Sequence, residues 1–327
     1  MKRRPPCSET AGNGITEDQT GACQTSESQS DNMKKILFIV NPIAGGKDKK
    51  EILGKVLSVL DKNLFSPEIR YTEYAGHACE MARETDADVV VAIGGDGTQN
   101  EVARSLVGTG RTMGIIPCGS GDGLALHLGI SRKTGKAAEV LNEGEAVFID
   151  NGIVNGHPFF CTTGVGIDAI VSWRFAKAGS RGLKTYIVES VKTWFGFKAE
   201  NYRITVDGEE KWNGKATLVT IGNANQWGNN ARITPLASAT DGLLDITIVD
   251  EFHTWAFPGL LARLMGGTAD RSRHTVCLRG KSIVIEREKE GPLHFDGDPY
   301  EMGKRIDISV AEHSLKVLVP KGRACKI

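Results

Sequence analysis

The residues best suited to chemistry in this sequence form the glycine-rich segment Gly94-Gly95-Asp96-Gly97-Thr98. The run 88–93, which is apolar except for Asp88 and typical of a buried parallel strand, precedes it, and a predicted helix at 98–107 follows it. Ligands of open α/β sheets bind at such junctions, where backbone N–H groups and the helix N-terminus attract phosphate. A carboxylate such as Asp96 within an anion-binding loop is explained by a divalent cation that also contacts the phosphate oxygens.

A purely structural interpretation of this segment also has to be weighed. Thr98 and Glu101 have the T-x-x-E spacing of a helix capping box, and the glycines would then only form a turn. A capping box does not exclude a ligand site. We favour the ligand site, because two further loops of similar composition support it.

These two loops also follow predicted buried strands. Asn41-Pro42-Ile43-Ala44-Gly45-Gly46 follows the apolar run at 36–40, and Pro117-Cys118-Gly119-Ser120-Gly121-Asp122-Gly123 follows the run at 113–116. The carboxyl ends of parallel strands meet at one edge of a sheet, so the loops are predicted to converge on one crevice. The sequence has no Walker A motif, and a nucleotide site would therefore be of another type.

Composition narrows the class of protein. Forty Lys and Arg residues balance forty Asp and Glu residues, which argues against a dedicated nucleic-acid binder with its basic surface. No apolar run approaches the roughly 18 residues of a membrane span. The seven cysteines are scattered and include no C-x-x-C pair, so neither a zinc site nor a disulfide framework is expected. This cysteine usage predicts a reducing, cytoplasmic compartment.

Changes of pattern divide the chain into regions. Residues 1–32 are rich in small polar residues and are predicted to be a disordered tail. Residues 33–150 alternate strand and helix patterns, which predicts an α/β domain with a parallel, Rossmann-like sheet. Residues 151–310 carry hairpin signals such as Asn155-Gly156 and predict a mainly antiparallel β domain. Residues 311–327 are predicted to pack back on the first domain.

The order of the motifs resembles that of the diacylglycerol kinase catalytic-domain family. This family includes bacterial lipid kinases, sphingosine kinases and ceramide kinases, and is more distantly similar to NAD kinases. The likeness runs from about 33 to 320 and rests on Asn41-Pro-x-Ala-Gly45, Gly94-Gly-Asp-Gly-Thr98, Pro117-x-Gly-Ser-Gly121, 164–169, 241–245 and 296–298. It implies an NAD kinase-like first domain, a β-rich second domain and a nucleotide in the cleft between them.

The resemblance implies a kinase that transfers the γ-phosphoryl group of ATP to a hydroxyl of a membrane lipid, with ATP and Mg²⁺ as cofactors. The lipid would be diacylglycerol or a sphingoid base, and Gly119-Ser120-Gly121 mildly favours the latter. The implied ATP-binding residues are Asn41, Pro42, Ile43, Ala44, Gly45, Thr72, Gly94, Gly95, Asp96, Gly97, Thr98, Gln99, Asn100, Glu101, Gly119 and Ser120. A structural magnesium site would use Asp241 and the backbone of Ser238 and Leu243. A plain β-turn at Asp241-Gly242 is the alternative.

The segment predicted to hold the catalytic base departs from the family pattern. Family members usually carry D-G-E there, with the glutamate as acceptor of the hydroxyl proton, whereas this chain has Asp296-Gly297-Asp298. Asp298 would then be the base, one methylene shorter, and Asp296 and Asp96 are the other catalytic candidates. Without the resemblance, this segment would be interpreted as a turn between two strands.

Two further acidic residues are predicted to contact the lipid substrate. Asp168 lies where sphingosine kinases place a carboxylate on the lipid head group, and Asp122 lies one position before the acid of many bacterial relatives. Arg181 and Lys184 follow at phosphate-reaching distance in sequence, although surface solvation is the favoured interpretation. The segment 164–169 also fits the dinucleotide fingerprint G-x-G-x-x-A, but its hairpin context argues against that site.

The remaining predictions concern the partners. An apolar stretch at 255–265 would cover an acyl chain or touch a bilayer, and ordinary core is the favoured interpretation. The predicted partners are a membrane lipid substrate, transient peripheral contact with the inner face of the membrane, no nucleic acid and a homodimer as a possible assembly. Two other functions stay open, an NAD kinase and a nucleotide- or lipid-binding protein without catalysis, the latter because of Asp298 and Asp122.

Overall fold

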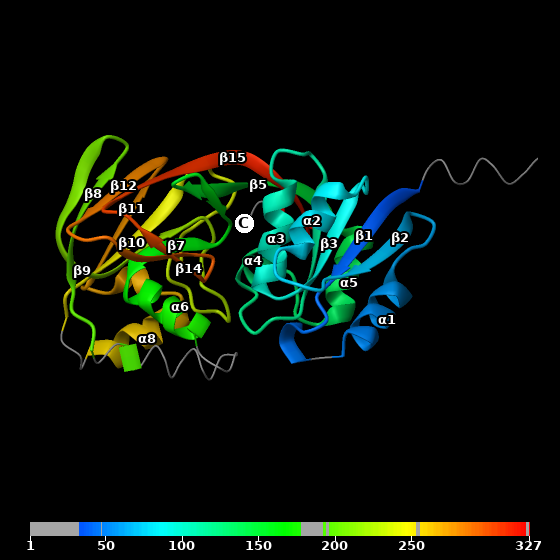
Figure 1. The fold of residues 1–327 in the computed structure, drawn as a ribbon, viewed down its shortest axis with the longest axis horizontal. Coiled ribbons are helices and arrows are strands. Elements are labelled where there is room, and N and C mark those ends of the chain that lie inside the picture. The colour runs from blue at the N-terminus through cyan, green and yellow to red at the C-terminus, as the bar shows by residue number, and fades with distance from the viewer. Residues whose placement is uncertain (1–32, 47, 178–191, 194–195, 253–255, 325–326) are drawn as a thin grey trace, which may run out of the picture. The chain divides into compact units, whose positions relative to one another are not determined.

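The computed structural model describes residues 33–46, 48–177, 192–193, 196–252, 256–324 and 327. The predicted tail, residues 1–32, lies outside the described residues. So do three residues from other parts of the chain, Arg181, Lys184 and Trp255. Within the described chain, the strands form one continuous sheet, which passes from parallel to antiparallel pairing (Figure 1). None of the helices in this part is long and apolar enough to cross a membrane.

Parallel strands form the first part of the sheet, in the order β4-β3-β1-β2. They are β1 (Lys34–Val40), β2 (Phe65–Tyr71), β3 (Val89–Gly94) and β4 (Thr112–Pro117). The helices between and after them are the short 3-10 helix η2 (Ala44–Gly46), α1 (Lys49–Val59), α2 (His77–Glu84), α3 (Asp96–Leu106), α4 (Gly123–His127) and α5 (Thr134–Glu143). Every residue of β3 is buried, because helices cover both faces of the sheet.

Antiparallel pairs form the second part. Its strands are β5 (Glu145–Val154), β6 (His157–Phe159), β7 (Thr162–Gly166), β8 (Glu200–Val206), β9 (Glu209–Gly222), β10 (Leu244–Asp250), β11 (Thr275–Gly280), β12 (Ser282–Arg287), β13 (Gly291–Phe295), β14 (Asp298–Met302) and β15 (Arg305–Val319). Among the described residues, its helical elements include α6 (Ile167–Lys177), α8 (Phe257–Gly266) and the 3-10 helix η4 (Ala269–Arg271). The predicted fold class, a parallel α/β region followed by a mainly antiparallel β region, is confirmed.

The long strand β15 belongs to both parts of the sheet. Its first half pairs with β12, and Lys316 and Val317 pair in parallel with β4 of the α/β region. β5 runs antiparallel beside it. The two regions are therefore joined by continuous backbone pairing, and the predicted boundary at residue 311 falls inside one strand.

Each region has its own apolar core. The α/β core contains the buried runs of β1, β3 and β4 together with the inward faces of the helices. The β-rich core contains large side chains such as Tyr202, Phe159 and Phe295. Arg104 of α3 crosses from one region to the other, since its guanidinium carbon lies 5.2 Å from the centre of the Phe295 ring.

Candidate functional site

The three glycine-rich loops lie against one another at the carboxyl ends of β1, β3 and β4. A Cβ added to Gly45 would lie 1.6 Å from the carbonyl oxygen of Cys118, and Gly45 also has a φ of +61°. A Cβ added to Gly95 would lie 3.2 Å from the Cα of Gly119. Only glycine can adopt this conformation at position 45 without a clash, so Gly45 is needed for the loops to pack this closely.

Asn41 links the first loop to α3, the helix that follows the second loop. Its Nδ2 donates to Thr98 Oγ1 at 2.9 Å, and its Oδ1 accepts the N–H of Ile43 at 3.1 Å. The buried Lys49, at the start of α1, donates to the carbonyl oxygen of Ala44 in the same loop. Sequence reasoning missed this lysine, although it follows the glycines of the first loop by only a few positions.

The predicted capping box of Thr98 and Glu101 is wrong. Helix α3 begins at Asp96, two residues earlier than predicted, so Thr98 lies inside its first turn. Glu101 instead accepts the N–H groups of Gly76 at 2.9 Å and Ala78 at 3.1 Å, and so satisfies the N-terminus of α2. The helix starts early because the Gly95 backbone is extended and an acid, Asp96, is favourable in the first turn.

Asp96 connects the second loop to the third. Its carboxylate accepts the N–H of Asp122 at 2.9 Å and the N–H of Gly123 at 2.8 Å, the residues at which the short helix α4 begins. A Cβ on Gly121 would lie 2.6 Å from Asp96 Oδ2. Each carboxylate oxygen keeps further lone-pair capacity, so Asp96 fits a cation next to bound phosphates as well as a role in loop structure.

Asp122 lies inside the third loop. Its side chain is buried, its φ is +49°, and its Oδ1 accepts from Gly119 N at 3.0 Å and Gln99 Nε2 at 3.1 Å. Burial and then the nearby charge of Asp96 raise the pKa of Asp122 to about 6. Arg132 Nε lies 3.4 Å from the other oxygen. The predicted substrate contact by Asp122 would therefore require the loop to open, whereas bracing the loop requires no change.

The predicted ATP residues fall into exposed and buried groups. Ile43 is 86% exposed although it is apolar, which suits a residue that a ligand covers. The other exposed members are Pro42, Gly45, Gly97 and Ser120. The partly exposed members are Asn41, Ala44, Gly95, Asp96, Glu101 and Gly119. The buried members, which support the loops from behind, are Thr72, Gly94, Thr98, Gln99 and Asn100.

The Asp296-Gly297 turn joins β13 to β14. Both residues have positive φ, +53° and +88°, as a tight hairpin turn requires. The Asp296 carboxylate accepts the N–H groups of Phe160 at 2.8 Å, Cys161 at 2.6 Å and Thr162 at 3.1 Å. Burial raises its pKa to about 6 despite these donors. Asp296 therefore anchors the turn.

Asp298 has a different environment from Asp296. It is the first residue of β14 and is exposed. The two acids of the motif therefore differ in that Asp296 accepts from three backbone N–H groups, whereas Asp298 is exposed at the surface.

Arg104 is a site residue that sequence reasoning missed. In addition to its contact with the Phe295 ring, it lowers the pKa of Asp296 through its positive charge, against the larger effect of burial. Its Nε and Nη2 atoms are buried and have no hydrogen-bond partner among the described residues. An arginine among the apolar residues Val102, Ala103 and Leu106 was the signal available in the sequence.

Asp168 lies in a buried polar cluster at the start of α6. Its Oδ2 accepts from Thr220 Oγ1 at 2.7 Å and lies 3.2 Å from His294 Nε2. Its Oδ1 accepts the N–H of Ala169 at 2.8 Å. The side chain of Asp168 is only 2% exposed, so the predicted contact with a lipid head group would have to be made from within this cluster.

The predicted magnesium residues make the contacts of a braced turn. Asp241 accepts the N–H of Leu243 at 3.1 Å and forms an ion pair with Arg279. Ser238 Oγ donates to the backbone oxygen of Ile327 at 2.6 Å. Arg279 already pairs with the Asp241 carboxylate, the one side chain of the predicted magnesium set, so this carboxylate fits a braced turn better than a magnesium site. Among the described residues, no group of three or more His, Cys, Asp and Glu side chains could hold a metal.

The fold and the loops define a two-region protein with a candidate phosphate site at the carboxyl ends of its parallel strands. A model of the diacylglycerol kinase catalytic domain matches residues 35–154, and a model of the YegS C-terminal NAD kinase beta sandwich-like domain matches residues 161–319. The chain belongs to the diacylglycerol kinase catalytic-domain family, and the resemblance inferred from the motifs is confirmed.

Curated relatives cover most of the chain. A diacylglycerol kinase of Bacillus subtilis (strain 168) is 26% identical over 300 residues, which are 89% of this chain and 98% of the relative. A probable lipid kinase YegS-like of Pectobacterium atrosepticum is 28% identical over 295 residues, 87% and 95% of the two chains. The family is therefore one of lipid kinases.

Solved structures agree on the fold. A protein from Bacillus anthracis str. Sterne superposes with a TM-score of 0.74 at 25% identity, over 88% of this chain and 98% of that one. An NAD kinase from Archaeoglobus fulgidus, solved in complex with ATP, superposes with a TM-score of 0.50 at 13% identity, over 89% and 96%. At that identity, the second likeness concerns the fold alone.

Proposed function

We propose that this protein is an ATP-dependent lipid kinase that transfers the γ-phosphoryl group to a hydroxyl of a membrane lipid. The observation that carries the proposal is the connection between the phosphate-type loops and the Asp296-Gly297-Asp298 turn. Helix α3 begins at Asp96 in the second loop, and its Arg104 contacts Phe295, the residue before the turn. One helix thus links the elements that would hold the donor and activate the acceptor.

Each part of the site has a definite role in this proposal. Backbone N–H groups of the glycine loops bind phosphate oxygens, and exposed Ile43 covers the nucleotide. ATP would supply the phosphoryl group, and Asp96 would hold a Mg²⁺ ion whose charge would offset that of the phosphates. Asp298 accepts the proton of the lipid hydroxyl as the oxygen–phosphorus bond forms and the bond to the leaving ADP breaks.

The named relatives favour diacylglycerol as the first substrate to test, ahead of the sphingoid base suggested by Gly119-Ser120-Gly121. A lipid substrate also requires brief peripheral contact with a bilayer, and we propose the inner face of the membrane. A homodimer stays a prediction.

The experiment is a thin-layer phosphorylation assay with γ-labelled ATP. Diacylglycerol and sphinganine in detergent micelles, together with NAD, are offered side by side. We expect label in a phosphorylated lipid. Label only in NADP would overturn the proposal in favour of an NAD kinase. ATP binding without transfer to any acceptor would instead identify a binding protein that lacks catalysis.

A further inference from the structure

Arg132 follows α4 in the chain and reaches back to the third glycine-rich loop. Its Nη2 donates to the carbonyl oxygens of Ser120 at 2.8 Å and Gly121 at 2.5 Å. Its Nε lies 3.4 Å from Oδ2 of the buried Asp122. One guanidinium group thus contacts three consecutive residues of the loop, which its planar arrangement of several N–H donors allows.

The same guanidinium group also contacts the β-rich region. Arg132 Nη1 donates to Asn229 Oδ1 at 3.1 Å, and the N–H of Asn229 donates to the Gly121 carbonyl oxygen at 2.8 Å. The two backbones lie close together here, since a Cβ on Gly228 would lie 2.9 Å from the Cα of Gly121. Arg132 therefore joins the third loop of the α/β region to a turn of the β-rich region.

Helix α8 holds this turn from its other side. The N–H of Arg232, three residues after Asn229, donates to the carbonyl oxygen of Leu264 at 3.0 Å. Leu264 and Leu260 pack with Ile167 in a small apolar cluster. Contacts with both the third loop and α8 fix the position of Asn229.

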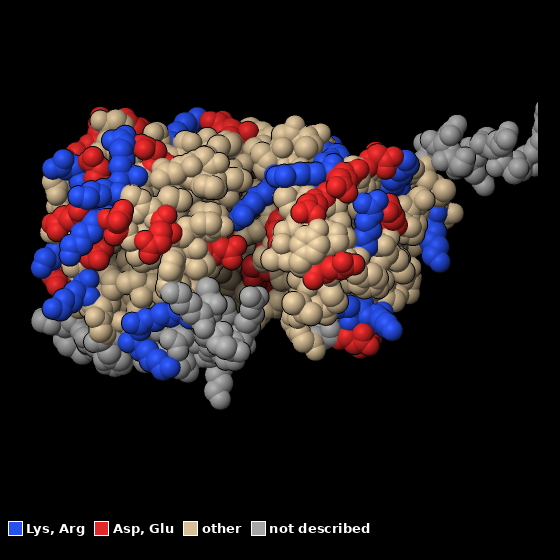
Figure 2. All heavy atoms as spheres, in the orientation of Figure 1, with Lys and Arg blue, Asp and Glu red and all other residues tan. Residues whose placement is uncertain are grey.

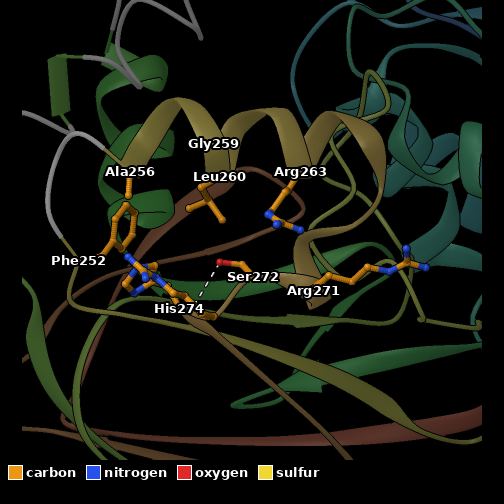
Figure 3. Close-up of a pocket in the computed structure, with 9 residues that line it drawn as sticks. Phe252, Ala256, Gly259, Leu260, Arg263, Arg271, Ser272 and His274 are labelled. Carbon is orange, nitrogen blue, oxygen red and sulfur yellow. Dashed lines mark hydrogen bonds between the residues drawn. The ribbon is translucent and has the colours of Figure 1, made fainter.

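Only one face of α8 takes part in this packing. Leu260 points into a cavity of about 440 Å³ that lies beside the helix (Figure 3). Leu261 and Met265, on the other face, are 42% and 49% exposed. The interpretation of this apolar stretch as ordinary core is therefore wrong for the outer face of the helix.

The contacts of Arg132 decide where the N–H groups of the loop point. In a planar trans peptide, the C=O and the N–H point in opposite directions. The peptide that follows Gly121 shows this, because its oxygen faces Arg132 and its N–H donates to Asp96 on the other side. The peptide that follows Ser120 is held by the same guanidinium group, so the N–H of Gly121 also points away from Arg132.

This N–H can bind a ligand. Among the described residues, the backbone N–H groups of Ser120 and Gly121 have no acceptor. Successive N–H groups of this kind bind phosphate oxygens in many loops. Figure 2 shows acidic side chains where the α/β region meets the β-rich region. Because acidic side chains repel an anion, phosphate binding here depends on well-aligned N–H donors.

We propose that Arg132 is a positioning residue that holds the third glycine-rich loop in the shape in which its N–H groups bind the phosphates of ATP. It acts from behind the loop, through the carbonyl oxygens of Ser120 and Gly121. Asn229 holds the guanidinium group in place from the β-rich region. The inference rests on the proposed function in that the ligand is ATP.

The test is ATP binding to the full chain, measured by isothermal titration calorimetry with Mg²⁺ present. Arg132→Met keeps an unbranched apolar side chain and removes the N–H donors, so we expect ATP to bind about 10- to 100-fold more weakly. Arg132→Lys, whose single ammonium group cannot reach all of these acceptors, should recover only part of the affinity. Lys133→Gln removes an exposed positive charge at the next position and should bind ATP like the wild type.

Asn229→Gly is a milder variant. Glycine suits the φ of +48° at this position and keeps the N–H that donates to Gly121. The variant loses the acceptor of Arg132 Nη1, so its ATP affinity should lie between those of the wild type and Arg132→Met. Added to Arg132→Met, it should cause no further loss, because Asn229 acts through Arg132. Additive losses would overturn this route.

A second measurement separates positioning from the proposed function. The N–H groups of Asp122 and Gly123 donate to Asp96, and NMR should show faster hydrogen exchange of both in nucleotide-free Arg132→Met. The comparison is made at a temperature where urea unfolding shows the variant to be folded. Wild-type ATP affinity or wild-type exchange in Arg132→Met would overturn the inference. If the wild type binds no ATP, the proposed function fails, and the exchange rates still decide whether Arg132 holds the loop.

Discussion

The carboxylate of Asp296 accepts the backbone N–H of Cys161 at 2.6 Å, which fixes the β13–β14 turn to the start of β7. Two more N–H groups, of Phe160 and Thr162, point to the same carboxylate. The first acid of the Asp296-Gly297-Asp298 motif is therefore a structural anchor. The second acid, Asp298, is exposed, and the proposed function assigns proton transfer to it.

The first prediction concerns Asp298 as the general base. Asp298→Asn keeps the shape of the side chain and removes its basicity, so turnover should fall by about 10²–10⁴-fold. The KM for ATP should hardly change, because the base acts on the lipid hydroxyl. Asp298→Glu restores the residue usual in the family and should remain active. Steady-state kinetics on micellar diacylglycerol measure both effects.

Asp296→Asn should act mainly on stability. An asparagine amide offers one acceptor oxygen, so at least one of the three buried N–H donors would lose its partner, at a cost of about 1–3 kcal/mol. Urea unfolding of wild type and variant measures this loss. At low temperature, where the variant stays folded, it should keep turnover. A stable but inactive Asp296→Asn beside a fully active Asp298→Asn would show that the base is Asp296.

Arg104 should position the acceptor side of the site. Arg104→Met keeps the apolar stem over Phe295 and removes the charge together with the buried Nε and Nη2 atoms that lack partners among the described residues. Stability should change little, since this desolvation cost disappears with the lost contact. Turnover should fall about 10- to 100-fold through misplacement of the turn, with the KM for ATP unchanged.

Two results would decide the role of Arg104. Because its charge lowers the pKa of Asp296, the pKa of that carboxyl should rise in Arg104→Met, as measured by NMR titration. Arg104→Lys should recover part of the turnover. Wild-type kinetics in Arg104→Met would show that the contact with Phe295 is only packing.

Asp96→Asn tests the link between the second and third loops. The variant should be folded but nearly inactive, because it removes the negative charge that would face the proposed Mg²⁺ ion. It also leaves one of the N–H groups of Asp122 and Gly123 without its acceptor. Since the charge of Asp96 contributes to the raised pKa of Asp122, that pKa should fall in the variant. Near-normal turnover would mean that Asp96 is only a structural residue.

Stability should depend on pH through Asp122. Its pKa rises from 3.8 in the unfolded chain to about 6 in the fold, chiefly through burial. Between these values the folded state holds more protons, so this group lowers stability as pH rises from about 4 to about 6. Asp122→Asn should reduce that decline by about 1–3 kcal/mol in urea unfolding across this window. Glu143→Gln, at an exposed acid of α5, should leave the slope unchanged.

The sequence by itself determined the architecture and the place of the loops. Apolar runs such as 36–40 and 89–93 are typical of strands covered on both faces, and the helix patterns between them favour parallel pairing. The glycine-rich loops could be predicted because a glycine is selected by the backbone conformation at its own position, as the positive φ of Gly45 shows. The same local signals gave the turn at Asp296-Gly297.

Only the tertiary structure decided which side chains of these motifs are held by distant parts of the chain. Asp296 meets Phe160 across 136 positions of the chain, and Asp96 meets Asp122 across 26, so neither partner is visible in a motif. Glu101 caps a different helix from the one that contains it, and Arg104 contacts a ring of the other region. The exposure of Leu261 likewise depends on what packs against α8. Hydrogen bonding and burial are properties of neighbours in space, which the spacing of residues along the chain does not specify.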